Sequence, residues 1–138
     1  MEHSIFDTGF LFGFFDNKDK HHADCKRIMS FELPNALLPD VVLPELAYLI
    51  LRELEVSVLT DFLRSVANGD FTLVRTTESD LKRAAEILEK YDDNNIDLVD
   101  AVIFAMAERL KIEKILTVDR RHFGVFKPGH CAAFQLLP

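Results

Sequence analysis

Two aspartates directly follow short apolar runs that are typical of buried strands. Asp7 comes after residues 4–6 (Ser-Ile-Phe), and Asp119 comes after residues 115–118 (Ile-Leu-Thr-Val). If both runs belong to one parallel sheet, the two carboxylates lie at its carboxyl edge, where such sheets bind ligands. Carboxylates held close together repel each other unless a proton or a cation compensates. Mg²⁺ takes carboxylate oxygens and keeps waters for a substrate phosphate, so the pair indicates a metal site, although Asp is also common at strand ends and turns.

Two further acids begin predicted helices. Glu45 lies in the first turn of a helix expected over residues 42–54, and Asp100 lies in the first turn of a helix expected over residues 97–110. Acids favour helix N-termini through the dipole, and Asp97 with Asp100 is a variant of the capping box, so helix capping is an alternative explanation. Asp100 nevertheless opens an almost wholly apolar helix, where an unpaired charge is costly. The candidate set is therefore Asp7, Glu45, Asp100 and Asp119.

Apolar strand-length runs alternate with helix-length segments along the chain. Strands are predicted at residues 4–6, 37–39, 71–74, 114–118 and 133–136. Helices are predicted at residues 8–15, 21–31, 42–54, 56–67, 77–90 and 97–110, with Thr77 and Asp80 as a second capping pair, and residues 120–130 are expected to be irregular. The alternation predicts an α/β fold, a sandwich whose central sheet of about five short strands is mostly parallel. Without a linker or repeat, residues 1–138 are expected to form one domain.

The composition limits how such a protein could bind nucleic acid. The chain has 138 residues, 49% of them apolar, and its 16 Lys and Arg against 23 Asp and Glu give a net charge of −7. This balance disfavours binding of nucleic acid by bulk electrostatics, so action on RNA would need bound cations and a local basic rim. No apolar run has the length of a membrane span, the N-terminus lacks the pattern of a signal peptide, and Cys25 and Cys131 match no zinc spacing. A cytoplasmic protein with reduced thiols is expected.

Taken in order, the four acidic segments resemble the motifs of the PIN-domain family. The segments are residues 7–11 (DTGFL), 43–48 (LPELAY), 98–101 (LVDA) with the apolar helix after them, and 115–123 (ILTVDRRHF). Each segment alone is a weak signal, whereas the ordered set covers the whole chain and is fairly specific. The set is most similar to the toxin branch of the family, the VapC-like ribonucleases of toxin–antitoxin pairs.

The resemblance implies a PIN-like three-layer α/β/α sandwich and a metal-dependent endoribonuclease that hydrolyses RNA phosphodiester bonds. It implies Mg²⁺ (or Mn²⁺) as the cofactor, bound by Asp7, Glu45, Asp100 and Asp119. Thr8 and Thr117 would support these ligands by hydrogen bonds, and for Asp97 a capping role is preferred to metal contact. The family further implies a small antitoxin protein as a partner, and a homodimer.

Positive side chains near the fourth acid are the candidates for RNA contact. Arg120 and Arg121 follow Asp119 directly, although a solvated charge pair would look the same in sequence. Three histidines, His21, His22 and His122, have no nucleophile to pair with and are expected to be surface loop residues.

Rival functions are weaker or lack a distinguishing residue. Phosphatases of the haloacid-dehalogenase kind need a second aspartate where Gly9 stands, and signalling receiver domains need an acid adjacent to the position of Asp7. The main alternative is a catalytically silent PIN-like module that binds protein or RNA, which the presence of all four acids disfavours. The sequence does not separate RNA from DNA as the substrate, nor does it give the number of metal ions.

Overall fold

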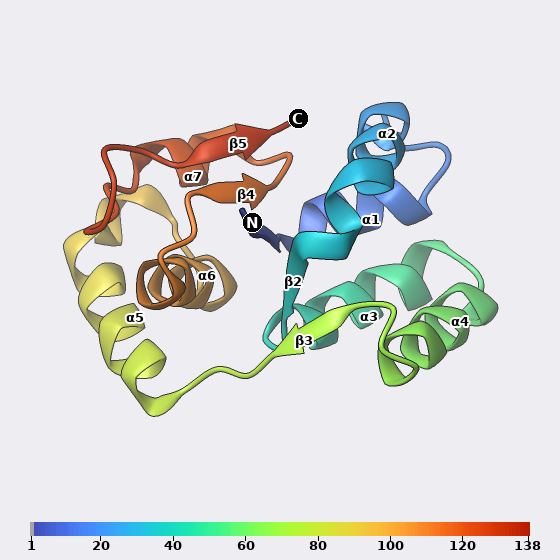
Figure 1. Ribbon diagram of the computed structural model, residues 1–138, viewed down its shortest axis with the longest axis horizontal. Coiled ribbons are helices and arrows are strands. Elements are labelled where there is room, and N and C mark those ends of the chain that lie inside the picture. Colours follow the sequence, from blue (N-terminus) through green and yellow to red (C-terminus); the bar gives the residue numbers. More distant parts are fainter. Residues whose placement is uncertain (1) are drawn as a thin grey trace.

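A five-stranded, wholly parallel sheet lies between two layers of helices in the computed structural model, which describes residues 2–138 (Figure 1). The strands are β1 (Ser4–Phe6), β2 (Ala36–Pro39), β3 (Thr72–Val74), β4 (Lys114–Leu116) and β5 (Gln135–Leu137). The helices are α1 (Thr8–Phe15), α2 (His22–Glu32), α3 (Val42–Glu53), α4 (Val56–Ala67), α5 (Glu78–Lys90), α6 (Leu98–Leu110) and α7 (Arg120–Val125), with short 3-10 turns at Leu33–Asn35 and Asp92–Asn94. Helices α1 to α4 cover one face and α5 to α7 the other, so the predicted α/β/α sandwich is confirmed.

The strand order, β3-β2-β1-β4-β5, makes β1 the central strand. In the register of its pairing with β4, Phe6 lies opposite Leu116, and the backbone N–H of Asp7 continues the ladder by donating to the Leu116 carbonyl at 2.9 Å. The residues that follow the two strands therefore leave the sheet side by side. This pairing positions the candidate site.

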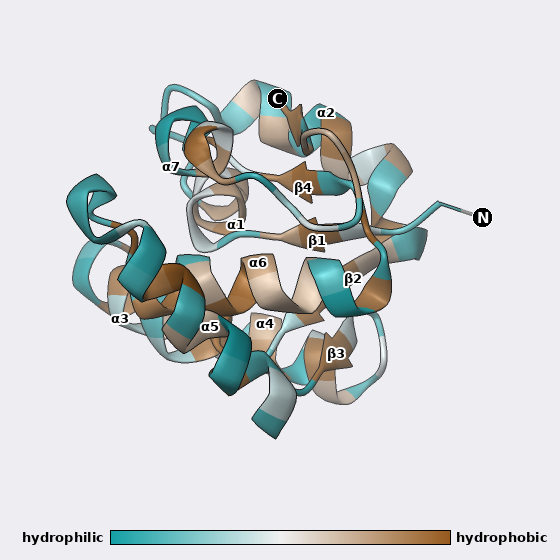
Figure 2. Cartoon of the chain, turned by 90° about the vertical axis from the view of Figure 1, so that its left-hand side faces the viewer, coloured by the Kyte–Doolittle hydropathy of each residue, from teal (hydrophilic) through white to brown (hydrophobic). Residues whose placement is uncertain are grey.

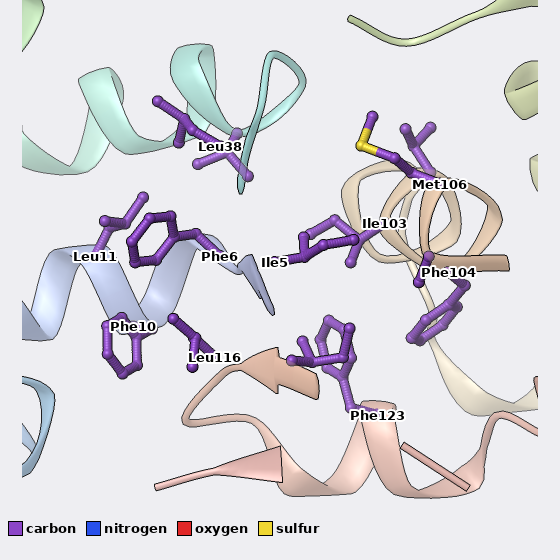
Figure 3. Packing of buried hydrophobic residues seen from close by; sticks show 14 of the residues in the cluster. Ile5, Phe6, Phe10, Leu11, Leu38, Ile103, Phe104, Met106, Leu116 and Phe123 are labelled. Carbon is purple, nitrogen blue, oxygen red and sulfur yellow. The ribbon is translucent and has the colours of Figure 1, made fainter. Parts of the chain in front are cut away.

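Both faces of the central strands β1, β2 and β4 are buried, which explains why these strands have no polar alternation. Successive strand side chains point to opposite faces, so Ile5 packs toward Ile103 of α6 while Phe6 packs toward Phe10 and Leu11 of α1 (Figure 3). Figure 2 shows the apolar strands behind α6 and the more hydrophilic surface of α5 outside it. Among residues 2–138, no helix combines the length and the apolar character needed to cross a membrane.

Helix α6 is the most buried helix of the described residues. The residues beside its two ends explain where it begins and where it stops. Asp97 accepts from the backbone N–H of Asp100 at 2.9 Å, and the Asp100 carboxylate accepts from the N–H of Asp97 at 3.4 Å, so the predicted capping pair is present. The helix ends at Lys111, which adopts a left-handed conformation with φ of 58°. Residues 100–107 are all buried, so the start of α6 is held firmly against the sheet.

Helix α7 lies where an irregular segment was predicted, so that expectation was wrong for residues 120–125. The Asp119 side chain accepts from the backbone N–H of His122 at 3.1 Å and caps the helix, and Phe123 anchors it in the core. A six-residue helix with a single buried side chain is too short to show a helical period in sequence. The final strand, predicted at 133–136, lies at Gln135–Leu137, and the strand predicted at 114–118 ends at Leu116.

An ion pair clamps α5 against α6. The guanidinium of Arg109 donates to both oxygens of Asp80 at 2.8 and 2.9 Å, and the Asp80 side chain is only 1% exposed. Burial alone would raise the pKa of Asp80, but the hydrogen bonds and the charge of Arg109 outweigh it and hold the pKa below the usual value. Removing the arginine would leave a buried carboxylate without its cationic partner.

We expect Arg109→Leu to lower the free energy of unfolding by about 3–5 kcal/mol, as measured by urea denaturation at neutral pH. The control is Arg64→Leu, because the Arg64–Asp61 pair is largely exposed on α4 and should contribute less than about 1 kcal/mol. Equal losses in the two variants would show that burial of Asp80 does not decide the effect.

Candidate metal-binding pocket

A pocket of about 340 Å³ lies at the carboxyl edge of the central strands. All four of the predicted acids line it, and they come from four separate segments of the chain: Asp7 after β1, Glu45 in α3, Asp100 in α6 and Asp119 after β4. The remaining lining residues are Thr8, Gly9, Leu49, Asp97, Val118 and His122. The fold therefore collects residues that are far apart in sequence.

Asp7 is the most buried acid of the pocket, with 6% of its surface exposed. One of its oxygens, Oδ2, accepts from the hydroxyl of Thr117 at 2.8 Å. Burial raises the pKa of Asp7 to about 7, with smaller contributions from the negative charges of Glu45 and Asp119, although hydrogen bonds from Thr117 and from the Thr8 backbone oppose the rise. Without a cation, this carboxylate is ionised only at a substantial cost.

Asp100 shares this environment at the start of α6. Burial raises its pKa to about 8, and the nearby charges of Asp97 and Asp7 add to the effect. Asp97 is more exposed and lines the pocket, and its side chain caps α6, which is the role preferred from the sequence. Two neighbouring carboxyls with raised pKa values in one pocket are typical of sites that use a metal or a proton.

Thr117 connects Asp7 to Asp119. Its side chain is fully buried, its hydroxyl donates to Asp7, and the same oxygen accepts from the backbone N–H of Asp119 at 3.0 Å. The spacing of the two aspartates is thus set by one hydroxyl between them. Thr117 therefore supports both aspartates of the pocket by hydrogen bonds.

His122 belongs to the site, so the prediction that it is a surface loop residue was wrong. Its Nδ1 lies 3.1 Å from Oδ2 of Asp100 and 3.0 Å from Oδ2 of Asp119. The sequence signal for this was the spacing of three residues between Asp119 and His122, which places both on one face once residues 120–125 are helical. Because that helix was not predicted, the signal was missed.

Glu45 and Gly9 complete the pocket wall. Glu45 is half-buried in the first turn of α3. Gly9 lies close to the segment that leaves β4, because a Cβ at this position would come within 3.0 Å of Cγ2 of Val118. A side chain at residue 9 would push α1 away from the exit of β4, and with it the acids on either side.

The donor set fits a hydrated, hard divalent cation. Within residues 2–138, no three His, Cys, Asp or Glu side chains stand ready-arranged around one metal position, and the acids are held by Thr117 and His122. Mg²⁺ needs only one or two protein carboxylates because it keeps several of its waters. The hydroxyl of Thr8 lines the pocket and is buried without a hydrogen-bond partner, which is the kind of group that such a water or a phosphate oxygen would satisfy.

The two arginines after Asp119 differ in their surroundings. Arg120 donates to the backbone carbonyls of Leu136, at 3.3 Å, and of Pro138, so it is tied to β5. Arg121 is exposed and has no hydrogen-bond or ion-pair partner in the described part of the chain. Arg121 lines a hollow of about 230 Å³. His122 lines both this hollow and the acidic pocket, so its side chain lies between them.

A parallel α/β/α sandwich with four carboxylates at the carboxyl edge of its central strands defines the class of the protein. The PIN domain family matches residues 4–126, and the chain belongs to this family. It is 31% identical over 134 residues to "Ribonuclease VapC26" of Mycobacterium tuberculosis, which covers 97% of this chain and 99% of that protein.

Solved structures share the fold. VapC20 of Mycobacterium tuberculosis, described as a sarcin-ricin loop cleaving toxin, matches with a TM-score of 0.75 and 21% identity over 81% of this chain and 86% of its own. DNA-bound VapBC from Salmonella typhimurium matches with a TM-score of 0.68 and 15% identity over 99% and 97% of the two chains. A toxin–antitoxin complex from Klebsiella pneumoniae matches with a TM-score of 0.68 and 18% identity over 89% and 92%.

The raised pKa of Asp7 predicts how stability depends on pH when no metal is present. Between about pH 4 and pH 7 the folded protein retains a proton that the unfolded chain has released, so the free energy of unfolding falls as the pH rises. We expect the Asp7→Asn variant to lack this pH-dependent fall, because its side chain carries no charge. In EDTA at pH 8, its free energy of unfolding should exceed that of the wild type by on the order of 2–4 kcal/mol.

Urea denaturation in EDTA at pH 4 and at pH 8 measures this difference. At the acidic pH, where Asp7 is protonated in the folded state, the variant should have little or no advantage. The same stability difference at both pH values would show that burial of the Asp7 charge is not its cause.

Proposed function

We propose that this chain is a Mg²⁺- or Mn²⁺-dependent endoribonuclease that hydrolyses RNA phosphodiester bonds in the pocket of Asp7, Glu45, Asp100 and Asp119. The convergence of these acids carries the proposal, because burying like charges together costs stability unless a cation binds among them. The choice of RNA is supported by the relative of 31% identity, whose name is that of a ribonuclease and whose length is almost fully covered.

Each residue of the pocket has a proposed task. Asp7 and Asp119 would hold the cation directly, and Glu45 and Asp100 would hold it directly or through water, where either could orient the attacking water. When bound, the cation supplies a water that loses its proton readily and a positive charge for the phosphate oxygens. Thr117 keeps Asp7 and Asp119 at their spacing, and Thr8 offers its free hydroxyl to water or phosphate.

The first test compares RNA cleavage by the wild type and by Asp7→Asn, with Mg²⁺ or Mn²⁺ and with EDTA. We expect cleavage that needs the metal and falls at least about 100-fold in the variant. Because Asp7→Asn should be no less stable than the wild type at pH 8, a lost activity would not reflect unfolding. Asp61→Asn is the matched control, since Asp61 is an exposed acid on α4, and it should cleave like the wild type.

Other outcomes of this assay separate the alternatives. Equal cleavage by the wild type and by Asp7→Asn would indicate a contaminating nuclease. Absence of cleavage on a panel of structured RNAs and on DNA, with tight RNA or protein binding retained, would favour the catalytically silent binding module. Cleavage of DNA but not of RNA would support the proposed metal site but would show that the substrate is DNA.

Arg121 is proposed as the RNA contact of the rim, and Arg120 as a weaker one because its guanidinium is already engaged with β5. We expect Arg121→Ala to raise KM several-fold with kcat changed less than about 2-fold, and to reduce the salt dependence of RNA binding by about one phosphate contact. Arg120→Ala should affect KM less and thermal stability more. A larger KM effect for Arg120→Ala in steady-state assays would reverse this assignment.

An antitoxin partner and a homodimer are part of the proposal. One protein of the same fold is described as a toxin–antitoxin complex and another as a member of the VapBC family of toxin–antitoxin systems, and this supports a small protein that binds and silences the chain. An antitoxin arginine among the carboxylates would satisfy their charge by bidentate hydrogen bonds. A short reading frame directly upstream of the gene would support the partner, and gel filtration of the purified chain tests the dimer. A cytoplasmic location is also part of the proposal, since RNA would be available there as the substrate.

A further inference from the structure

We propose that His122 is a positioning residue that joins Asp100 to Asp119 and sets the geometry in which the pocket binds a divalent cation. The inference rests on the metal site proposed above and goes beyond it. It starts from the two contacts of one ring nitrogen, because Nδ1 lies 3.1 Å from an oxygen of Asp100 and 3.0 Å from an oxygen of Asp119. We take Nδ1 as the ring nitrogen that carries a hydrogen, since one N–H can lie between two carboxyl oxygens.

The imidazole is held so that it faces these acids. His122 donates its backbone N–H to Oδ1 of Asp119 at 3.1 Å, while its ring contacts Oδ2, so a single residue fixes both oxygens of that carboxylate. The next residue, Phe123, is buried in the core and anchors α7. The Asp119 carboxylate therefore has one orientation relative to α7.

The other ring nitrogen shows that the arrangement is not optimised for stability. Nε2 of His122 is buried and has no hydrogen-bond partner within residues 2–138. Leaving a polar group unpaired in the interior costs free energy. The ring's polar contacts are those with the two acids, so its position is explained by the site and not by the packing of α7.

His122 closes a continuous network around the pocket. Thr117 links Asp7 to Asp119 by hydrogen bonds, and His122 links Asp119 to Asp100. In the described part of the chain, the Asp100 carboxylate accepts a hydrogen bond from the backbone N–H of Asp97, which caps the same helix. Within residues 2–138, the His122 ring is the side chain that contacts both the acid of α6 and the acid that follows β4.

This position predicts the effect of losing the ring. Two carboxylates without the donor between them repel each other, and the Asp100 side chain becomes free to turn away from Asp119. Groups that orient metal ligands in this way contribute about 10–100-fold to metal affinity. The expected loss is therefore one of cation binding, with the protein still folded.

The decisive experiment measures the Kd of Mn²⁺ for the whole chain, from the free-Mn²⁺ EPR signal and by calorimetry at neutral pH. His122→Leu removes the donor, whereas His122→Asn places a side-chain N–H near the position of Nδ1. We expect about 10–100-fold weaker binding for His122→Leu and recovery to within about 3-fold of the wild type for His122→Asn. The matched control is His22→Leu on α2, whose ring contacts the Gly13 carbonyl, and it should bind like the wild type.

A second measurement needs no metal. A ¹H–¹⁵N correlation spectrum of the histidine rings in the EDTA-treated wild type should show the Nδ1 of His122 protonated. An unprotonated Nδ1 would overturn the proposal. Urea denaturation of each variant keeps a weakened Kd from being confused with unfolding.

The outcomes separate the two proposals. Unchanged Mn²⁺ binding in His122→Leu would overturn the role of His122, and tighter binding would do so as well, by showing that the ring occupies the place of the cation. Either result, with metal-dependent cleavage by the wild type, would leave the proposed nuclease intact. A wild type that neither binds Mn²⁺ nor cleaves RNA would overturn both.

Discussion

The parallel pairing of β1 with β4 is the constraint on which the rest of the structure depends. In its register Phe6 lies opposite Leu116, and the Asp7 N–H extends the ladder, so the chain leaves both strands at the same edge and the same depth. Asp7 and Thr117 are then close enough to share a hydrogen bond, which in turn fixes Asp119. Because both sheet faces are packed, a shift of one residue in this register would exchange core and site side chains.

The pocket is built at a cost in stability. Burial raises the pKa values of Asp7 and Asp100, and the hydrogen bonds from Thr117 to Asp7 and from the Asp97 backbone to Asp100 offset only part of that cost. The core compensates through apolar packing on both sides of β1, and the Arg109–Asp80 pair holds α5 to α6. A cation of the kind proposed would offset this cost, because it would compensate the charges of the neighbouring carboxylates.

The acidic balance of the chain and the proposed substrate are compatible. A net charge of −7 gives no general attraction to RNA, so the proposed function would depend on the cation and on a few arginines at the rim for recognition. The structure gives the adjacent pair Arg120 and Arg121 different surroundings, since one guanidinium is bound to β5 while the other is exposed beside the pocket. Adjacent residues of identical type thus differ in role because of what surrounds them.

The sequence by itself determined what depends on neighbours along the chain. The apolar strand runs, the helices with the Thr77–Asp80 and Asp97–Asp100 caps, and the acids at strand ends all follow from local patterns, and the order of the motifs indicated the family. Only the tertiary structure decided which strands are neighbours, how deeply Asp7 and Asp100 are buried, and that His122 lies between two acids. These properties arise from contacts between residues distant in sequence. The short helix α7 shows the limit most clearly, because its cap at Asp119 and its anchor at Phe123 act only when the sheet and α6 are already in place.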